Sequence, residues 1–251
     1  GYDNIDVAAA TKRGILVTNT PEVLTETVAD FAWALLMACA RRVVEADRST
    51  RLGEWKTWGP TMLLGVDISG KTLGVVGAGR IGSSVARRAA GFNMKILYTD
   101  SIRKLELEKQ TGAEFVDLDT LLRKSDFISL HVSLTDETKH LIAKPELDKM
   151  KSTAILINTS RGPVVDQKDL YDALASGRIL AAGLDVFATE PIPTSDPLLK
   201  LKNVVVTPHI ASASVETRGK MAEVAAQNLL DGLFGRTPRF TVNPEVLSTH
   251  R

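Results

Sequence analysis

Side chains able to do chemistry follow five short apolar runs of this 251-residue sequence, one after another. They are Asp100 after KILYT, Val132 and Ser133 after FISLH, Thr159, Ser160 and Arg161 after AILIN, Asp185 after AAGL, and His209 after NVVVTP. Ligands of an open parallel sheet bind outside the carboxyl ends of its strands. If the runs are parallel strands, these side chains therefore share one site.

Three polar residues predict acid–base chemistry on a carboxylate-bearing substrate. The guanidinium of Arg161, in a Ser-Arg-Gly turn, can grip a carboxylate through two parallel hydrogen bonds, although a solvated or ion-paired loop arginine is the alternative. His209 follows a proline in a loop before a predicted helix, which suits a general acid or base. Glu190, in DVFATEP, would orient that imidazole and stabilise its protonated form.

A glycine-rich stretch predicts a dinucleotide site. In TLGVVGAGRIGSSVARR, from Thr72 to Arg88, a β-favouring run leads into Gly77, Gly79 and Gly82 and then into a helical pattern. The glycines would permit a tight turn, approach of a pyrophosphate and close helix packing. The phosphates would lie at the helix N-terminus. The motif alone is weak evidence, but Asp100 ends the next strand near the spacing expected of an acid that binds ribose hydroxyls.

Asp100 also predicts the cofactor, which we expect to be NAD. Its carboxylate can accept hydrogen bonds from both ribose hydroxyls and would repel a 2′-phosphate. Arg103 and Lys104 follow closely and leave NADP as the alternative, if they turn inward to meet that phosphate.

The pattern of elements predicts an α/β fold. Seven short apolar strands alternate with helical segments from Thr72 onward, which is typical of a doubly wound parallel-sheet Rossmann domain. Asp117 and Asp166 are predicted N-caps of two of the helices. One long helix is expected from Glu22 to Leu52, with a loop or arm after it, and a last helix ends near Gly235.

Composition limits the partners. A formal charge of +1 and the absence of a long basic run give no reason to expect nucleic acid or an anionic membrane, so a small-molecule ligand fits better. The longest apolar run, FAWALLMACA, is too short for a bilayer span and predicts a buried helix. Cys39 is the single cysteine, expected to be an inert buried thiol, and a cytoplasmic location follows. No metal site is predicted.

Two tryptophans in the arm after the long helix leave two interpretations open. Trp55 and Trp58 lie in GEWKTWGPTMLLGVDISG, which has no clear period. Exposed aromatic residues would indicate a partner surface, whereas tryptophans that fold back on the core of their own domain would not.

The motifs together resemble a known family. GAGRIG with its distant Asp100, NTSRGPVVD, GLDVFATEP and TPHIAS look like the signatures of the D-isomer-specific 2-hydroxyacid dehydrogenases. The stretch from Asp169 to Ile210 is most similar to glyoxylate/hydroxypyruvate reductases. The resemblance implies an oxidoreductase that transfers a hydride between a nicotinamide cofactor and a small 2-oxo acid or D-2-hydroxy acid, and a homodimer that uses the arm from Trp55 to Leu64.

The resemblance also implies roles for individual residues. Arg161, Glu190 and His209 match the catalytic trio, and Asp185 would face the nicotinamide end of the cofactor. The cofactor-binding set is Gly77, Gly79, Arg80, Ile81, Gly82, Asp100, Val132, Ser133, Thr159, Ser160, Arg161, Asp185, His209 and Ala211, and the substrate-binding set is Gly1, Arg161, His209 and Ser212. His131, His140 and His250 are expected to be structural or solvent-exposed.

The same resemblance predicts the domain organisation. Residues 1–23 are interpreted as a remnant of a flavodoxin-like substrate domain, 24–213 as the Rossmann domain, and 214–251 as a C-terminal helix and tail that return to the substrate domain. Family members begin with more of the substrate domain, so a catalytically impaired, truncated member is one alternative. The other is an NAD-binding, corepressor-like protein that recruits partners.

Overall fold

The computed structural model describes residues 1–248, which form two compact units. The smaller unit combines residues 1–27 with the chain from Ser212 onward, and the larger unit runs from Val28 to Ala211. The sequence-based division lies at slightly different points, with a Rossmann domain over 24–213. Each unit is described by itself below.

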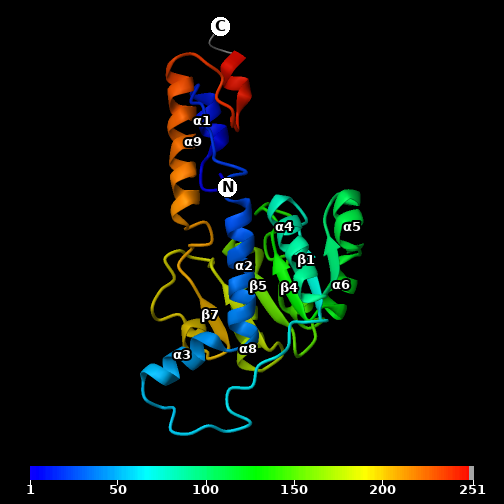
Figure 1. The fold of residues 1–251 in the computed structure, drawn as a ribbon. Coiled ribbons are helices and arrows are strands. Elements are labelled where there is room, and N and C mark those ends of the chain that lie inside the picture. Colours follow the sequence, from blue (N-terminus) through cyan, green and yellow to red (C-terminus); the bar gives the residue numbers. More distant parts are fainter. Residues whose placement is uncertain (249–251) are drawn as a thin grey trace. The chain divides into compact units, whose positions relative to one another are not determined.

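The larger unit is built on a parallel sheet of seven strands, in the order β3-β2-β1-β4-β5-β6-β7. Figure 1 labels β1, β4, β5 and β7 of this sheet. The strands are β1 (Thr72–Val76), β2 (Lys95–Thr99), β3 (Glu114–Phe115), β4 (Phe127–Leu130), β5 (Ile155–Asn158), β6 (Ala181–Leu184) and β7 (Val204–Val206). All seven correspond to predicted strands, and every neighbouring pair is parallel. The predicted doubly wound α/β fold is confirmed.

One face of the sheet packs against α2 (Thr25–Ala40), α4 (Arg80–Ala89) and α5 (Leu105–Thr111). Side chains alternate along each strand, so that Leu73 and Val75 of β1 point into this layer while Val76 points into the other. The indole of Trp33 stacks on Phe92 and donates a hydrogen bond to a carbonyl of α4. Apolar residues thereby cover this face of the sheet.

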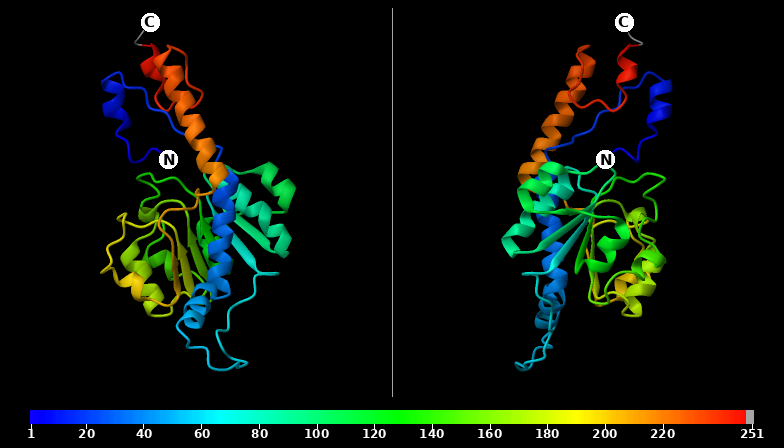
Figure 2. Two further views of the ribbon diagram at one scale, coloured as in Figure 1. Left: turned by 60° about the vertical axis from the view of Figure 1, so that its left-hand side comes forward. Right: turned by 90° about the vertical axis from the view of Figure 1, so that its right-hand side faces the viewer.

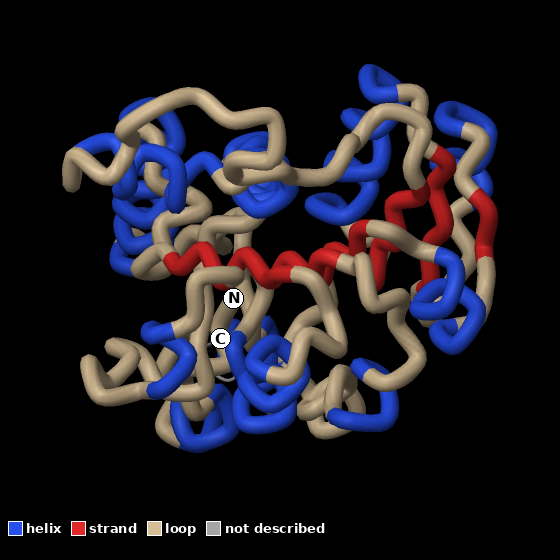
Figure 3. The backbone as a smooth tube through the Cα atoms, turned by 90° about the horizontal axis from the view of Figure 1, so that it is seen from below, coloured by secondary structure: helices blue, strands red, loops and turns tan. Residues whose placement is uncertain are grey.

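The opposite face packs against α6 (Leu118–Lys124), α7 (Lys144–Leu147) and α8 (Gln167–Ala175), and Figure 3 shows helices on both sides of the strands. Asp117 accepts a hydrogen bond from Thr120 N at 2.8 Å, and Asp166 accepts one from Asp169 N at 3.0 Å. Both predicted N-caps are confirmed. Short 3-10 turns complete the unit: η1 (Ala90–Phe92), η2 (Gly162–Val164) and η3 (Pro197–Lys200).

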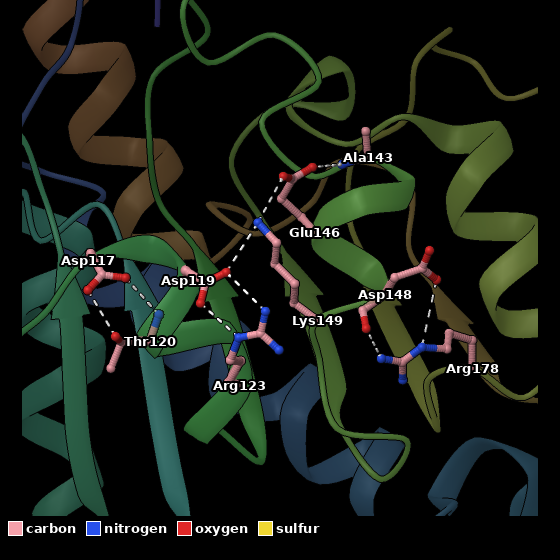
Figure 4. Close-up of polar contacts among 9 residues, drawn as sticks. All are labelled: Asp117, Asp119, Thr120, Arg123, Ala143, Glu146, Asp148, Lys149 and Arg178. Atoms are coloured by element: carbon pink, nitrogen blue, oxygen red, sulfur yellow. Dashed lines mark hydrogen bonds and ion pairs between the residues drawn. The ribbon is translucent and has the colours of Figure 1, made fainter.

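Charged side chains connect α6 with Lys149, which follows α7, and connect Asp148 with Arg178, which follows α8 (Figure 4). Asp119 pairs with Arg123 Nε at 2.7 Å and with Lys149 Nζ at 3.3 Å, which lowers the pKa of the Asp119 carboxyl. Arg178 donates to the carbonyls of Met150 and Asp148. Exposed ion pairs of this kind are worth about 0–1 kcal/mol each, so the buried layers beneath them carry most of the stability.

The prediction of one long helix from Glu22 to Leu52 is wrong. The helix ends at Ala40, and a second helix, α3 (Val43–Arg51), begins after a break. Arg42 has a left-handed backbone with φ of 53°, which an uninterrupted helix does not allow. The carbonyl of Ala40 instead accepts a hydrogen bond from Val66 N at 2.8 Å. Among the described residues no helix combines the length and the apolar character that crossing a membrane requires.

The arm that follows α3 is an extended loop, visible in both views of Figure 2. Trp55 is 59% exposed and Trp58 is 74% exposed. The alternative in which these tryptophans fold back on the core is therefore wrong. Cys39 is buried as expected, and burial raises the pKa of its thiol to about 12.

The smaller unit contains α1 (Val7–Lys12), α9 (Val215–Leu233) and the 3-10 turn η4 (Pro244–Ser248). The side chain of Asn243 connects its two chain segments. Its Oδ1 accepts a hydrogen bond from Val17 N at 2.7 Å, and its Nδ2 donates to Ile15 O and Thr11 Oγ1 at 2.9 Å. The segments also meet in a bridge between Thr18 and Thr241.

We expect Gly74→Ala to destabilise the larger unit. A Cβ at Gly74 would lie 2.6 Å from Leu121 Cδ2 and would also collide with Ser125 Oγ, so β1 and α6 would have to separate. Overpacking of this kind costs about 1–3 kcal/mol. Thermal and urea unfolding measure the loss.

Gly91→Ala is the matched control, because its Cβ would meet nothing within 4 Å. It should leave the free energy of unfolding unchanged or raise it by up to about 1 kcal/mol. Equal stability of the two variants would contradict the tight contact between β1 and α6.

Candidate active site

The glycine-rich turn between β1 and α4 uses its three glycines in three different ways. Gly77 has a left-handed φ of 89°, and a Cβ there would lie 2.8 Å from Val132 N. A Cβ on Gly82 would collide with the carbonyl of Gly77. A Cβ on Gly79 would meet nothing within 4 Å, so this position borders open space.

These observations fit a bound pyrophosphate. Gly79 is the N-cap residue of α4 and, as a glycine, has no side chain that could cap the helix. The first N–H groups of a helix lack intrahelical partners, and the helix dipole is positive at this end. The turn thus offers an anion site at the carboxyl edge of the sheet, with room for the anion beside Gly79.

Asp100 lies next to this turn. Its Oδ2 accepts a hydrogen bond from Ala78 N at 2.8 Å, which ties the end of β2 to the loop after β1. Its Oδ1 accepts one from Ile102 N at 3.2 Å and lies 3.6 Å from Lys104 Nζ. The carboxylate is thereby held beside the glycine-rich turn, and its contact with a ribose stays a prediction.

The two basic residues after Asp100 have different surroundings. Arg103 donates from Nε and Nη2 to the two oxygens of Glu108, both at 2.8 Å, and these hydrogen bonds lower the pKa of Glu108 to about 2. Tyr98 donates its hydroxyl proton to the same carboxylate at 2.7 Å. Lys104, in contrast, faces Asp100. The pairing of Arg103 with Glu108 is not apparent from the sequence.

Arg161 lies in the turn after β5, and Asn158 shapes that turn. Asn158 Nδ2 donates to Arg161 O at 2.9 Å, and its Oδ1 accepts from Ser160 N at 3.0 Å and Ser160 Oγ at 2.8 Å. Our sequence reasoning missed Asn158, although its position as the last residue of a buried strand is a recognisable signal. The guanidinium of Arg161 donates from Nη1 to Ser160 O at 2.7 Å.

Gly162 brings the Arg161 turn against the loop after β6. A Cβ at Gly162 would collide with Phe187 C and O and would lie 2.6 Å from Ala188 N. The two loops therefore touch through their backbones. The loop after β6 carries Glu190, so this contact connects the position of Arg161 with that of Glu190.

Glu190 and His209 form the expected pair. Glu190 Oε2 and His209 Nδ1 are 2.7 Å apart, and Glu190 Oε1 accepts a hydrogen bond from Phe187 N at 3.0 Å. Both side chains remain partly exposed. A carboxylate on Nδ1 leaves Nε2 of the imidazole as the atom that can face a substrate. The pair joins the loops that follow β6 and β7.

Asp185 lies among the backbone groups of the loop that carries His209. It is 0% exposed, and its carboxylate accepts hydrogen bonds from Thr207 Oγ1, Ile210 N and Ala211 N at 2.6, 2.9 and 2.7 Å. The expected contact with a nicotinamide stays a prediction. The structure brings Asp185 together with Ala211 and with the residues on both sides of His209.

Other predicted site residues are distributed as follows. Val132 packs against Gly77 behind the glycine-rich turn, and Ser133 O accepts a hydrogen bond from Thr138 Oγ1 at 2.6 Å. Among the described residues, Thr159 Oγ1 is one of two buried side-chain oxygens without a hydrogen-bond partner. Its hydroxyl group can therefore donate a hydrogen bond to a bound ligand or accept one from it. Gly1 and Ser212 belong to the smaller unit.

The remaining histidines have separate surroundings. His131 Nε2 lies 2.8 Å from Ser129 Oγ, and burial lowers the pKa of this imidazole to about 3, so it is neutral at physiological pH. His140 Nδ1 lies 3.5 Å from Asp166 Oδ2. His250 lies outside the described residues.

Comparison with known proteins gives the family. The model of the D-isomer specific 2-hydroxyacid dehydrogenase, NAD binding domain, matches residues 33–211. A glyoxylate reductase of Korarchaeum cryptofilum is 64% identical over 248 residues, which are 98% of this chain and 75% of the relative. A glyoxylate reductase of Thermococcus litoralis is 57% identical over 253 residues, which are 99% of this chain and 76% of the relative.

Solved structures agree with this result. A protein of Thermus thermophilus is 49% identical and superposes with a TM-score of 0.90, over 96% of this chain and 76% of that one. Sequence and fold thus match over nearly the whole chain, including the glycine-rich turn and the loops that carry Arg161, Glu190 and His209. The chain belongs to the D-isomer specific 2-hydroxyacid dehydrogenase family, and residues 33–211 are its NAD-binding domain.

Proposed function

We propose that this chain is a glyoxylate reductase-type oxidoreductase, which transfers a hydride between a nicotinamide cofactor and a small 2-oxo acid such as glyoxylate or hydroxypyruvate. The observation that carries the proposal is the pair of Glu190 and His209, 2.7 Å apart, on loops at the carboxyl edge of an NAD-binding sheet. Relatives named glyoxylate reductase, one of them 64% identical, support the substrate class.

Each residue of the trio has a role in this proposal. Bound NADH would supply the hydride. Arg161 binds the carboxylate of the oxo acid and polarises its carbonyl group. His209 donates a proton from Nε2 to the developing alkoxide, while Glu190 holds the ring and stabilises its protonated form.

The cofactor would lie along the carboxyl edge of the sheet. We propose that the turn with Gly77, Gly79 and Gly82 binds the pyrophosphate together with the first residues of α4, Arg80 and Ile81. Asp100 would accept hydrogen bonds from the adenosine ribose. The residues that remain for the nicotinamide half are Val132, Ser133, Thr159, Ser160, Arg161, Asp185, His209 and Ala211.

The smaller unit would be part of the substrate domain. Substrate contacts of its residues Gly1 and Ser212 stay a prediction from the resemblance. We also propose a cytoplasmic location, because the single cysteine is buried and makes no disulfide.

A homodimer is the expected assembly, and the arm supplies its surface. Besides the exposed Trp55 and Trp58, the arm presents Leu64, which lines a groove of about 690 Å³ with Val44 and Leu199. An exposed aromatic arm beside a groove with apolar and charged lining residues suits a twofold interface, in which the arm of one copy enters the groove of the other.

The first test is the effect of His209→Ala on turnover. With NADH and glyoxylate, kcat should fall about 100- to 10,000-fold, because positioned acid catalysis contributes a factor of that size. Glu190→Gln should give a smaller loss, since the amide keeps a hydrogen bond to the ring but loses its charge. Initial rates from NADH absorbance measure both, and calorimetry should give an unchanged Kd for NADH.

His140→Ala is the control, because this histidine also has a left-handed backbone and a carboxylate neighbour, Asp166, yet lies outside the trio.

Arg161→Ala should mainly raise KM for glyoxylate, and Arg161→Lys should not restore the KM of the wild type, since a lysine lacks the planar guanidinium that makes two parallel hydrogen bonds. A His209→Ala enzyme with normal kcat, or a wild-type chain that binds NADH and recruits partners without turnover, would refute the proposed function.

Cofactor choice is the second prediction. We expect NADH to be preferred over NADPH by about 100-fold in kcat/KM, because the Asp100 carboxylate repels a 2′-phosphate. Asp100→Asn should narrow that ratio, and Glu106→Gln, an equal change of charge on α5, should not. A wild-type preference for NADPH would show that Lys104, at 3.6 Å from Asp100, dominates the pocket.

The third prediction is the mass in solution. Light scattering at micromolar concentration should give twice the 27.2 kDa of one chain. Trp58→Ser should weaken the dimer, whereas Leu105→Ser, which removes an exposed apolar side chain outside the arm, should not. A wild-type monomer would count against the interface.

A further inference from the structure

One carboxylate of α5, that of Glu108, closes the loop between β2 and α5. Its Oε1 accepts hydrogen bonds from Arg103 Nε at 2.8 Å and from the Tyr98 hydroxyl at 2.7 Å, and its Oε2 accepts one from Arg103 Nη2 at 2.8 Å. The Tyr98 hydroxyl in turn accepts one from Lys104 N at 2.7 Å. Glu108 thereby joins the end of β2, the loop and the first turns of α5.

The pair of Arg103 and Glu108 fixes the direction of the guanidinium. Two parallel hydrogen bonds between a planar guanidinium and a carboxylate define the orientation of both groups. The Glu108 side chain is only 17% exposed, whereas that of Arg103 is 60% exposed. The hydrogen bonds lower the pKa of Glu108 to about 2, so this carboxylate is charged at neutral pH. The positive charge of Arg103 is therefore balanced within the pair.

The same loop begins at Asp100, which is proposed to meet the adenosine ribose. A 2′-phosphate beside Asp100 would place two anionic groups next to each other, and a nearby cation would have to offset their repulsion. Arginine suits a phosphate because it can donate two parallel hydrogen bonds to it. Arg103 follows Asp100 closely in sequence, but two of its donor groups are directed to Glu108. Lys104 Nζ, in contrast, lies 3.6 Å from Asp100 Oδ1.

From this geometry we propose that Glu108 is a positioning residue that determines cofactor choice: it holds the guanidinium of Arg103 away from the adenosine ribose and so withholds it from a 2′-phosphate. The inference rests on the proposed function, in which Asp100 meets the ribose hydroxyls. Two carboxylates then act against NADPH in different ways. Asp100 repels the 2′-phosphate directly, and Glu108 removes the arginine that would attract it.

The test is Glu108→Gln, with binding measured by calorimetry. Both oxygens of the carboxylate accept hydrogen bonds, so the NH₂ group of a glutamine would face a donor, and the paired geometry with Arg103 would be lost. The probes are adenosine 2′,5′-bisphosphate and 5′-AMP, which differ only in the 2′-phosphate. The Kd of the bisphosphate should fall about 10-fold, whereas the Kd of 5′-AMP should stay within about twofold.

A double-mutant cycle with Arg103→Ala separates the release of the guanidinium from the loss of a negative charge. In the wild-type background, Arg103→Ala should leave the Kd of the bisphosphate within about twofold, because the guanidinium is withheld there. In the Glu108→Gln background, Arg103→Ala should cancel the gain in affinity. A gain that persists without Arg103 would overturn the inference.

Two control variants separate this role from general effects on α5 and its loop. Glu106→Gln removes an equal charge from the same helix, where Glu106 accepts a hydrogen bond from Gln110 Nε2 at 2.8 Å, and should give no such gain. Tyr98→Phe removes the hydroxyl between Lys104 N and Glu108 but keeps the pair with Arg103. It should therefore not favour the bisphosphate over 5′-AMP, even if it loosens the loop.

The intact cofactors extend the test to turnover. In Glu108→Gln, the ratio of kcat/KM for NADPH to that for NADH should rise by the same factor as the affinity for the bisphosphate. An unchanged Kd of the bisphosphate in Glu108→Gln, or an equal gain in Glu106→Gln, would overturn the inference and leave the proposed reaction untouched. A wild-type chain that binds NADH but does not reduce glyoxylate would refute the proposed function instead, because the binding probes contain no nicotinamide.

Discussion

The structure depends on the burial of both faces of a parallel sheet. The helices α2, α4 and α5 cover one face, and α6, α7 and α8 cover the other, so the open ends of the strands are the places left for chemistry. Because all seven strands run in one direction, their carboxyl ends meet at a single edge. The polar residues after β2, β4, β5, β6 and β7 are thereby brought to one edge, although the loops that carry them are far apart in sequence.

At that edge, hydrogen bonds between neighbouring loops hold the predicted site residues in defined positions. Asp100 ties the end of β2 to the glycine-rich turn, Asn158 shapes the turn that carries Arg161, and Glu190 joins the loops after β6 and β7. Each of these carboxylate or amide groups accepts hydrogen bonds from a backbone N–H group or holds a side chain. The scaffold places the loops, and these contacts set their conformations.

Much of the fold and part of the candidate site could be predicted from the sequence. Alternation of apolar strands and helices predicted the sheet, and glycine spacing predicted the turn, because both depend on local sequence. Arg161, Glu190 and His209 could be predicted to share one site since each follows a strand, and the structure places Glu190 Oε2 2.7 Å from His209 Nδ1. The break in the helix at Arg42 could not be predicted, because it depends on a hydrogen bond from Val66 N to Ala40 O. These two residues are separated in sequence by α3 and the arm. For the same reason, the pairing of Arg103 with Glu108 and the hydrogen bonds of Asp185 required the tertiary structure.

The contact at Gly162 has a consequence for substrate choice. The backbone of the turn that carries Arg161 touches the backbone of the loop that carries Glu190 at this point. We therefore expect the turn and the loop to move as one rigid unit. A larger side chain at Gly162 cannot move one of the two loops alone, so the proposed anchor for the carboxylate and the proposed support of the proton donor would shift together. Substitutions that let an enzyme of this fold accept a bulkier acid are therefore easier in loops other than these two.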